Sequence, residues 1–311
     1  MLYAGQAVLL AFLLVAAMVG RRFFLGYSLL FLGGCGLAKT NSTTNSQFDY
    51  PNKLHFAVTD LSGSDALERD FGAFRQVLEE TLQLPVVFFA VENYSAAAPA
   101  LLADELDFVM AGPSEYLLLR ARAGAIPIIG ITRPKYAAMV MTRVDSGIDQ
   151  LSDLKGKTIA MRTEGSTAGH IMPMKMLLDA GVPPEDYQVV MLNRQGFEAL
   201  QSGQVDAWSD SHDRYVEYVK APGLEGTDIQ VIAASDHLPP DVFVANPSLG
   251  PRYLEELRNH MLDHQETLIA ALLASEANQK YKTSELVAVT DADYQVLRDS
   301  YYAIGQGSAI E

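Results

Sequence analysis

Residues 153–170 read DLKGKTIAMRTEGSTAGH, and this stretch decides which fold the rest of the chain is expected to adopt. The apolar run 158–161 predicts a strand, Gly165 allows a sharp turn, and a helix is predicted to begin directly after it. Free backbone N–H groups at the start of that helix, with the hydroxyls of Ser166 and Thr167, suit a phosphate-like or sulfonate-like group. The same two residues could instead only cap the helix, as serine and threonine commonly do.

Short apolar runs alternate with amphipathic stretches on both sides of this segment. Runs that predict strands are residues 54–58, 86–89, 108–111, 126–131, 138–142, 158–161, 188–192, 205–208 and 229–233. Amphipathic stretches such as 71–83 and 171–180 separate most of them, and residues 251–304 are predicted to be helical only. This order is typical of an α/β protein whose sheets are mostly parallel and flanked by helices.

A weak internal repeat indicates two related units. Residues 101–116 and 200–215, which lie 99 positions apart, share a leucine, an aspartate and a tyrosine at matching places, although chance could produce this. Each copy would place a loop at the carboxyl end of a strand, where open α/β sheets bind ligands. We therefore expect two lobes, residues 53–142 plus 235–311 and residues 143–234.

The two lobes are expected to face each other across a cleft that can close. Strands near Val140–Arg143 and Val231–Ser235 are predicted to cross between the lobes and to act as the hinge. Trp208 is expected to lie near this cleft and to report closure by its fluorescence.

Composition excludes several classes of protein. A chain of 311 residues is long enough for two lobes, and its net charge of −15 argues against nucleic-acid binding, which needs clustered Lys and Arg. Its single cysteine allows neither an internal disulfide nor a cysteine-based zinc site. The pair His260 and His264 is interpreted as part of a solvated helix face, so no metal and no cofactor are expected.

The first fifty residues resemble an export signal. An apolar run at 7–19 and a second run at 23–34 flank Arg21-Arg22, and neither run reaches the ~20 residues that span a bilayer. The arginine pair resembles a twin-arginine signal, and the residues before Cys35 resemble a lipobox whose cysteine becomes acylated. We expect a signal segment at 1–34 and a flexible tether at 35–52, with a transmembrane hairpin or one long anchor as the alternative.

Six short motifs occur in a characteristic order along the chain. They are Glu92-Asn93-Tyr94, Ala111-Gly112-Pro113-Ser114-Glu115-Tyr116, Thr132-Arg133-Pro134-Lys135-Tyr136, Asp153-Leu154-Lys155-Gly156-Lys157, Gly165-Ser166-Thr167-Ala168-Gly169-His170, and Leu238-Pro239-Pro240-Asp241-Val242-Phe243. In this order and spacing the chain resembles the phosphate/phosphite/phosphonate-binding proteins of ABC importers over nearly all of residues 53–300. The resemblance implies a two-lobed type II periplasmic-binding-protein fold.

The resemblance also implies an oxyanion loop. The family's loop matches Ser166 and Thr167, with Ala168 where many members carry a further serine. The family's two pocket tyrosines match Tyr94 and Tyr136, whose hydroxyls can donate to the same oxyanion. Each tyrosine could otherwise be an ordinary half-buried aromatic residue.

Further residues are implied on the other side of the ligand. The family's acidic residues, which face an ammonium group in aminophosphonate binders, fall near Asp213 and Asp241. Asn193 stands where the family often has a histidine. With Ala168 it leaves the oxyanion fewer donors, so a related compound could replace a phosphonate. Asp213 could instead cap a helix, and Asp241 could stabilise a turn.

Four more residues are candidates by position. Ser114 and Tyr116 begin the helix after Gly112-Pro113, where they could line the cleft from the opposite lobe or only pack. Arg133 and Arg162 lie beside predicted cleft loops and could bind an oxyanion through two hydrogen bonds, although surface exposure is the commoner outcome.

The expected function is that of an exported, lipid-anchored solute-binding protein of an ABC importer, which captures a phosphonate-like oxyanion. Permease and ATPase subunits are its expected partners, the lipid anchor is its only expected membrane contact, and a monomer is expected. Alternatives are a binding protein of the same fold for a sulfonate or a pyrimidine precursor, a sensory domain, or an enzyme. No Gly-x-Ser-x-Gly elbow, cysteine nucleophile or dinucleotide motif supports the enzyme.

Overall fold

A computed structural model describes residues 51–61, 63–91, 96–220 and 228–311, which belong to one unit spanning Phe48–Glu311. The predicted signal segment, Cys35, nearly all of the tether and Tyr94 lie outside the described residues. Within the described ranges, none of the helices combines the length and the apolar character that a membrane crossing requires. The structural account therefore concerns the folded part of the chain.

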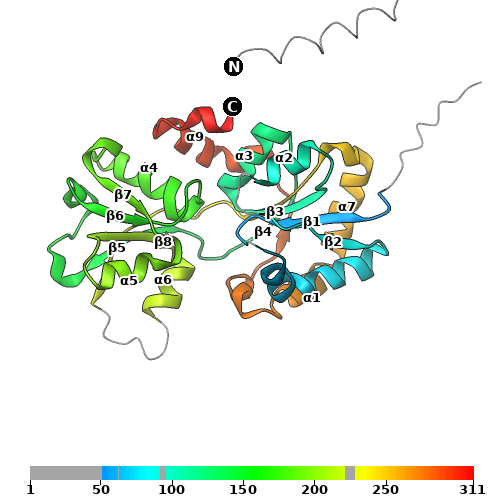
Figure 1. Cartoon of the computed structure of the whole chain (residues 1–311), viewed down its shortest axis with the longest axis horizontal. Helices are drawn as coiled ribbons and strands as arrows, with labels where there is room; N and C mark the ends of the chain where they lie inside the picture. The colour runs from blue at the N-terminus through cyan, green and yellow to red at the C-terminus, as the bar shows by residue number, and fades with distance from the viewer. Residues whose placement is uncertain (1–50, 62, 92–95, 221–227) are drawn as a thin grey trace, which may run out of the picture. The chain divides into compact units, whose positions relative to one another are not determined.

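The first sheet has six strands in the order β11-β4-β10-β3-β1-β2. Its parallel strands are β1 (Leu54–Val58), β2 (Val86–Phe88) and β3 (Phe108–Ala111), and its antiparallel part adds β4 (Ile126–Ile131), β10 (Asp241–Ala245) and β11 (Leu286–Val287). The helices that accompany it are α1 (Ser64–Leu82), α2 (Ala97–Leu102), α3 (Pro113–Ala123), α7 (Pro251–Asp263) and α8 (Gln265–Leu272). Helices cover both faces of this sheet (Figure 1).

The second sheet has five strands in the order β7-β6-β8-β5-β9. These are β5 (Ala138–Arg143), β6 (Thr158–Met161), β7 (Gln188–Met191), β8 (Ala207–Ser211) and β9 (Ile229–Ala234). Helix α4 (Met172–Asp179) lies on one face, and α5 (Gly196–Gln201) and α6 (His212–Val219) lie on the other (Figure 1). Two sheets flanked by helices confirm the predicted α/β class.

The two sheets repeat one topology, as the internal sequence repeat predicted. The order β1-α1-β2-α2-β3-α3 recurs as β6-α4-β7-α5-β8-α6, with strand orders β2-β1-β3 and β7-β6-β8. The aspartates shared by the two sequence copies make the same bond in each sheet. Asp107 Oδ2 accepts from the His55 N–H of β1 at 2.7 Å, and Asp206 Oδ2 accepts from the Thr158 N–H of β6 at 2.9 Å.

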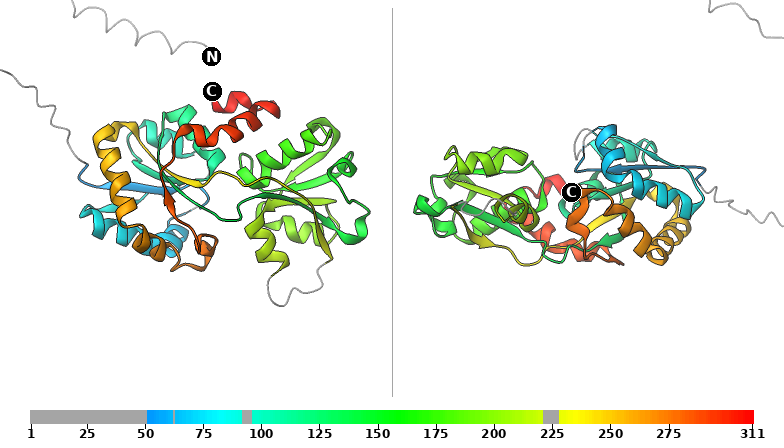
Figure 2. Two further views of the ribbon diagram at one scale, coloured as in Figure 1. Left: turned by 180° about the vertical axis from the view of Figure 1, so that it is seen from behind. Right: turned by 90° about the horizontal axis from the view of Figure 1, so that it is seen from below.

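The segments that join the sheets differ from the predicted hinge. Both β5 and β9 pair within the second sheet, so residues 138–142 lie with that sheet and not with the first lobe. The chain crosses between the sheets at residues 132–137 and 235–240, just outside the predicted positions (Figure 2). The two crossings are tied by hydrogen bonds from Leu238 N to Tyr136 O at 2.8 Å and from Ser235 N to Ala138 O at 2.9 Å.

Two strands were absent from the prediction. Strand β10 occupies the centre of the first sheet, although its five residues follow two prolines and resemble a loop motif in the sequence. Strand β11 has two residues, and it corrects the prediction that the C-terminal stretch is helical only. Both segments are strands because each pairs with β4, and not because of their local β-propensity.

Three apolar clusters form the core. Phe56, Phe74, Phe108 and Phe243 meet in the first sheet, with Phe108 and Phe243 stacked at 5.4 Å between ring centroids. A second cluster joins α3 and α4 through the C-terminal helix α9 (Gln295–Ala303), which contacts both (Figure 1). Trp208 is 1% exposed and packs against Phe197 and Tyr218 in the third cluster, away from the cleft lining, so the expectation that it reports closure is wrong.

Local packing predicts different effects on stability for two Gly→Ala substitutions, one beside Trp208 and one in α1. A Cβ on Gly196 would lie 2.5 Å from Trp208 Cδ1, so Gly196→Ala should lower the free energy of unfolding by about 1–3 kcal/mol through overpacking. A Cβ on Gly72, inside α1, would meet only the mobile end of the Glu68 side chain at 2.9 Å. Gly72→Ala should therefore be neutral or stabilising by up to about 1 kcal/mol. Urea unfolding followed by circular dichroism measures both; equal effects would contradict the packing argument.

Candidate functional site

A cleft of about 1310 Å³ lies between the two sheets. Its walls come mostly from loops at the carboxyl ends of strands, which is where parallel α/β sheets bind ligands. The residues on which its chemistry depends are Thr59 and Asp60 after β1, Gly112 and Glu115 after β3, Arg162 and Ser166–Ala168 after β6, Ser211–Asp213 around the end of β8, Arg133 and Tyr136 in the first crossing, Asp241 in β10, and Lys280–Tyr281.

The predicted oxyanion loop forms part of this wall. Gly165 has a φ of 84°, and this turn leads into one turn of π-helix, Thr167–Ile171, that runs on into α4. Ser166, Thr167 and Ala168 are all buried and all line the cleft. The Ser166 hydroxyl makes no capping bond to this helix, so the capping alternative does not account for it.

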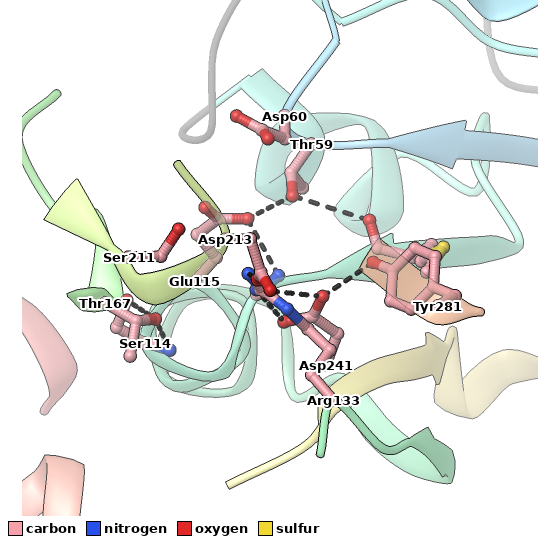
Figure 3. Close-up of polar contacts among 12 residues, drawn as sticks. Thr59, Asp60, Ser114, Glu115, Arg133, Thr167, Ser211, Asp213, Asp241 and Tyr281 are labelled. Carbon is pink, nitrogen blue, oxygen red and sulfur yellow. Dashed lines mark hydrogen bonds and ion pairs between the residues drawn. The ribbon is translucent and has the colours of Figure 1, made fainter. Parts of the chain in front are cut away.

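Thr167 is also the point at which the two lobes touch. Ser114 N donates to Thr167 Oγ1 at 3.0 Å, the two hydroxyls lie 2.7 Å apart, and Ser114 Oγ donates to Gly165 O at 2.6 Å (Figure 3). Ser114 is fully buried behind the cleft and is not part of its lining, which corrects the prediction that it lines the cleft. It contacts the loop that lines the cleft through Thr167 and Gly165.

Tyr116 also lies outside the cleft lining. Its side chain is buried on α3, its ring packs against Tyr294 at 4.8 Å between centroids, and its hydroxyl donates to Asp291 Oδ1 at 2.7 Å. Tyr116 lies outside the lining because it is on the face of α3 that packs against the C-terminal segment. The predicted ligand contact from Tyr116 is therefore replaced by a packing role.

Arg133 is buried with only 7% of its surface exposed, contrary to the expectation of surface exposure. One Nη is paired with Asp213 Oδ2, and the other lies 3.4 Å from both oxygens of Asp241 (Figure 3). Its guanidinium carbon lies 3.6 Å from the centroid of the Tyr136 ring. Burial by itself would lower the pKa of Arg133, but Asp241 and Asp213 raise it, so the guanidinium stays charged.

Tyr136 and Tyr281 add phenol groups to this cluster. Tyr281 donates to Asp241 Oδ2 at 2.6 Å, which satisfies an oxygen that Arg133 shares. Tyr136 is 4% exposed and lines the cleft as predicted, and burial raises its pKa. It therefore remains a neutral phenol, able to donate a hydrogen bond, at physiological pH.

A second ion cluster is centred on Arg162. Its Nη2 lies 2.8 and 3.0 Å from the two oxygens of Asp60, and its Nη1 lies 3.9 Å from Asp210 Oδ1. Burial by itself would raise the pKa of Asp60, but Arg162 together with Lys280, Arg214 and Arg194 lowers it below its ordinary value. Burial raises the pKa of Asp210. Asp60 and Arg162 follow the equivalent strands β1 and β6, so this pair bridges the two lobes.

Glu115 is a buried acid in the first turn of α3. Its Oε2 accepts a hydrogen bond from the Thr59 hydroxyl and another from Gly112 N, the latter at 3.0 Å. Burial and the neighbouring charge of Asp60 raise the pKa of Glu115 to about 7. Its carboxyl therefore changes protonation near neutral pH.

The remaining predicted residues fall outside the cleft or outside the described residues. Asn193 is exposed at the end of β7 with a φ of 48°, and its neighbour Arg194 lines the cleft in its place. The prediction for Asn193 is corrected, because the turn after β7 points this side chain to solvent. Tyr94 lies outside the described residues.

Metal binding has no visible candidate in the part of the chain that the structure describes. No group of three or more His, Cys, Asp or Glu side chains there is arranged to hold an ion. The rings of His260 and His264 stack at 4.2 Å, and His264 Nδ1 lies 2.9 Å from His260 O.

Several cleft residues escaped the sequence analysis, namely Thr59, Asp60, Glu115 and Lys280. Thr59 and Asp60 carried a usable signal, because they directly follow a predicted strand as Arg162 follows another. Glu115 lay inside a quoted motif without a role. Lys280 lies in a six-residue 3₁₀ helix, Glu276–Tyr281, and nothing local in the sequence distinguishes it from a surface lysine.

Comparison with known proteins gives consistent results. The family model described as "ABC transporter, phosphonate, periplasmic substrate-binding protein" matches residues 56–294. The "Phosphate-import protein PhnD" of Mycolicibacterium smegmatis is 24% identical over 299 residues, which covers 85% of this chain and 88% of that protein.

Two solved structures share the fold. PhnD1 from Prochlorococcus marinus in complex with methylphosphonate has a TM-score of 0.68 at 17% identity, covering 82% of this chain and 99% of that one. The periplasmic aliphatic sulphonate binding protein SsuA from Escherichia coli has a TM-score of 0.59 at 17% identity, covering 84% and 94%. The predicted two-lobed periplasmic-binding-protein fold is thereby confirmed.

The raised pKa of Glu115 predicts a pH-dependent stability. Its carboxyl has a pKa of about 7 in the folded protein, compared with an ordinary value of 4.5. Between these two pH values the folded protein holds a proton that the unfolded chain has lost. The free energy of unfolding therefore falls as the pH rises from 4.5 to 7. Glu115→Gln carries no charge and should gain roughly 2–3 kcal/mol relative to the wild type between pH 5 and pH 8. Urea unfolding at both pH values measures this.

The exposed Glu266 supplies a matched control, because Glu266→Gln removes the same charge from the surface. This variant should follow the wild type at both pH values. A stability difference between Glu115→Gln and the wild type that is constant from pH 5 to pH 8 would refute the proposed shift.

Proposed function

Because this chain belongs to the family of periplasmic substrate-binding proteins of phosphonate ABC transporters, we propose that its cleft captures a small phosphonate-like oxyanion. As a component of such an importer it is exported and acts with permease and ATPase subunits. The ligand is delivered to them chemically unchanged.

The observation that carries this proposal is the set of buried hydroxyl donors on one wall of the cleft. Ser166, Thr167 and Tyr136 are each less than a tenth exposed, and all three line the same cavity. Hydroxyls and the N–H groups of a helix start are suited to a tetrahedral oxyanion, and hydrogen bonds to a charged group are about twice as strong as neutral ones. Tyr94 is proposed as a further donor.

The names of similar proteins support an oxyanion of this class. The mycobacterial relative is named for phosphate import, and PhnD1 was solved with methylphosphonate. A sulfonate is the alternative, because Ala168 and the solvent-facing Asn193 leave the site with fewer donors, which suits a singly charged group. The two ligands have the same tetrahedral shape and differ in charge.

We further propose that the ligand is enclosed by movement of two lobes, residues 53–137 plus 235–311 and residues 138–234. The support is that, in the described part of the chain, the backbone passes between the two sheets at two segments, residues 132–137 and 235–240. Contacts between Ser114 and Thr167 and between Asp60 and Arg162 would then belong to the closed state.

Calorimetric titration of residues 41–311 tests the oxyanion site. Phosphate, phosphite, methylphosphonate and methanesulfonate are compared, and we expect tight binding of a phosphorus oxyanion. Ser166→Ala should weaken it by about tenfold or more, since it removes a donor to a charged group. Thr167→Ala should weaken it to a similar extent, because it removes the hydroxyl that bonds the loop to Ser114. Thr167→Ser retains the hydroxyl and should bind within about threefold of the wild type. Preferred binding of the sulfonate would favour the alternative ligand.

We propose that Cys35 carries the lipid that holds the protein at the membrane, and that the folded part is a monomer. The support is the lipobox-like sequence before this cysteine. Cys35→Ala should shift the exported protein from the membrane fraction to the soluble fraction, because the acylated residue is lost. Immunoblotting of the fractions measures this, and an unchanged membrane fraction would argue for a transmembrane anchor.

A further inference from the structure

Two arginines of the chain itself already contact four carboxylates of the cleft. Asp213 and Asp241 share the guanidinium of Arg133 (Figure 3). Asp60 shares Arg162 with Asp210. Tyr281 donates a further hydrogen bond to Asp241 at 2.6 Å. These four carboxylates therefore already face a positive charge before any ligand enters.

This arrangement is unfavourable for a ligand that carries an ammonium group. Such a group needs a carboxylate that no fixed cation already contacts, and Arg133 contacts both Asp213 and Asp241 from a buried position. The guanidinium also occupies the face of Tyr136, at 3.6 Å, where a ligand cation could otherwise stack. An added cation would lie beside a fixed one.

Glu115 is a buried acid of the cleft without a cationic partner in any described contact. Its Oε2 already accepts from the Thr59 hydroxyl and from Gly112 N, and its pKa of about 7 leaves it only partly charged at neutral pH. It is therefore a weak substitute for an ionised carboxylate.

Lys280, in contrast to these acids, is a cation of the cleft. It lines the cleft, yet the described residues offer it no ion pair and no hydrogen bond, and its Nζ lies 5.0 Å from the centroid of the Tyr281 ring. Burial and the nearby Arg133 lower its pKa, while Asp241 and Asp60 oppose them. An anion in the cleft would supply the partner that this ammonium lacks.

We propose that the cleft takes a small oxyanion without a cationic group, and that Lys280 is the charge partner of this oxyanion. The inference rests on the proposed function and adds the substrate class: alkylphosphonates or phosphite, and not aminoalkylphosphonates. Arg133 serves as a built-in counter-ion for the two carboxylates.

Titration of the wild type with three phosphonates tests the substrate class. Propylphosphonate and 2-aminoethylphosphonate have nearly the same size, so their affinities differ through the ammonium group, and methylphosphonate reports the oxyanion alone. We expect propylphosphonate to bind at least about tenfold more tightly than 2-aminoethylphosphonate at pH 7.5. The inference, but not the proposed function, would be overturned if propylphosphonate and 2-aminoethylphosphonate bound with equal affinity. The same holds if neither of them bound while methylphosphonate did. Failure of all phosphorus oxyanions to bind would overturn the proposed function, and the inference with it.

Variants then test the two residues. Lys280→Met should weaken methylphosphonate binding by about tenfold or more, whereas Lys155→Met, which removes a surface lysine paired with Asp186, should leave it unchanged. Wild-type affinity in Lys280→Met would overturn the role of this lysine.

Arg133→Met removes the cation that contacts Asp213 and Asp241. The affinity for 2-aminoethylphosphonate relative to propylphosphonate should therefore rise by about tenfold or more. If Arg133→Met does not fold, Asp213→Asn, which leaves Arg133 paired with Asp241, provides the second measurement. It should lower the affinity for 2-aminoethylphosphonate further, because the cleft becomes more positive. A folded Arg133→Met with the wild-type ratio, or an Asp213→Asn protein that binds 2-aminoethylphosphonate more tightly, would overturn the inference.

Discussion

The buried guanidinium of Arg133 is the interaction on which the cleft depends. It lies in the first crossing segment, and its two carboxylate partners come from different sheets, Asp213 from α6 and Asp241 from β10. A charge removed from water is tolerated only when it is paired, and removing one partner of such a pair typically costs about 3–5 kcal/mol. Arg133 therefore ties the first crossing segment to both lobes.

The repeated topology explains why charged groups meet in this cleft. Each half places its functional loops at the carboxyl ends of its parallel strands, and the two edges face each other across the cavity. Asp60 and Arg162 lie within two residues of the ends of the equivalent strands β1 and β6 and carry opposite charges, so the repeat brings them together as a salt bridge between lobes. Ser114 and Thr167 make a second bridge at the start of two helices.

Electrostatics and hydrogen bonding divide the cleft into two regions. The hydroxyls of Ser166, Thr167 and Tyr136 form a neutral wall, while the arginines and the acids that they contact form a charged region. An oxyanion at the first wall needs little compensation from elsewhere, because hydroxyl groups and the ammonium group of Lys280 are already present in the cleft. The acidic net charge of −15 therefore does not oppose an anionic ligand.

The amino-acid sequence by itself determined the α/β class, most strands and the loop at residues 165–168, because apolar periodicity, glycine turns and helix-start residues are local properties. The aspartates 107 and 206 marked the repeat in the same way. Strands β10 and β11, the true crossings, the inward position of Arg133 and the outward position of Asn193 were decided only by tertiary structure. Each of these depends on a partner far away in the chain: β4 for the two strands, Asp213 and Asp241 for the arginine. A pattern of neighbouring residues does not contain such partners, since pairing and burial are set by the packed sheets.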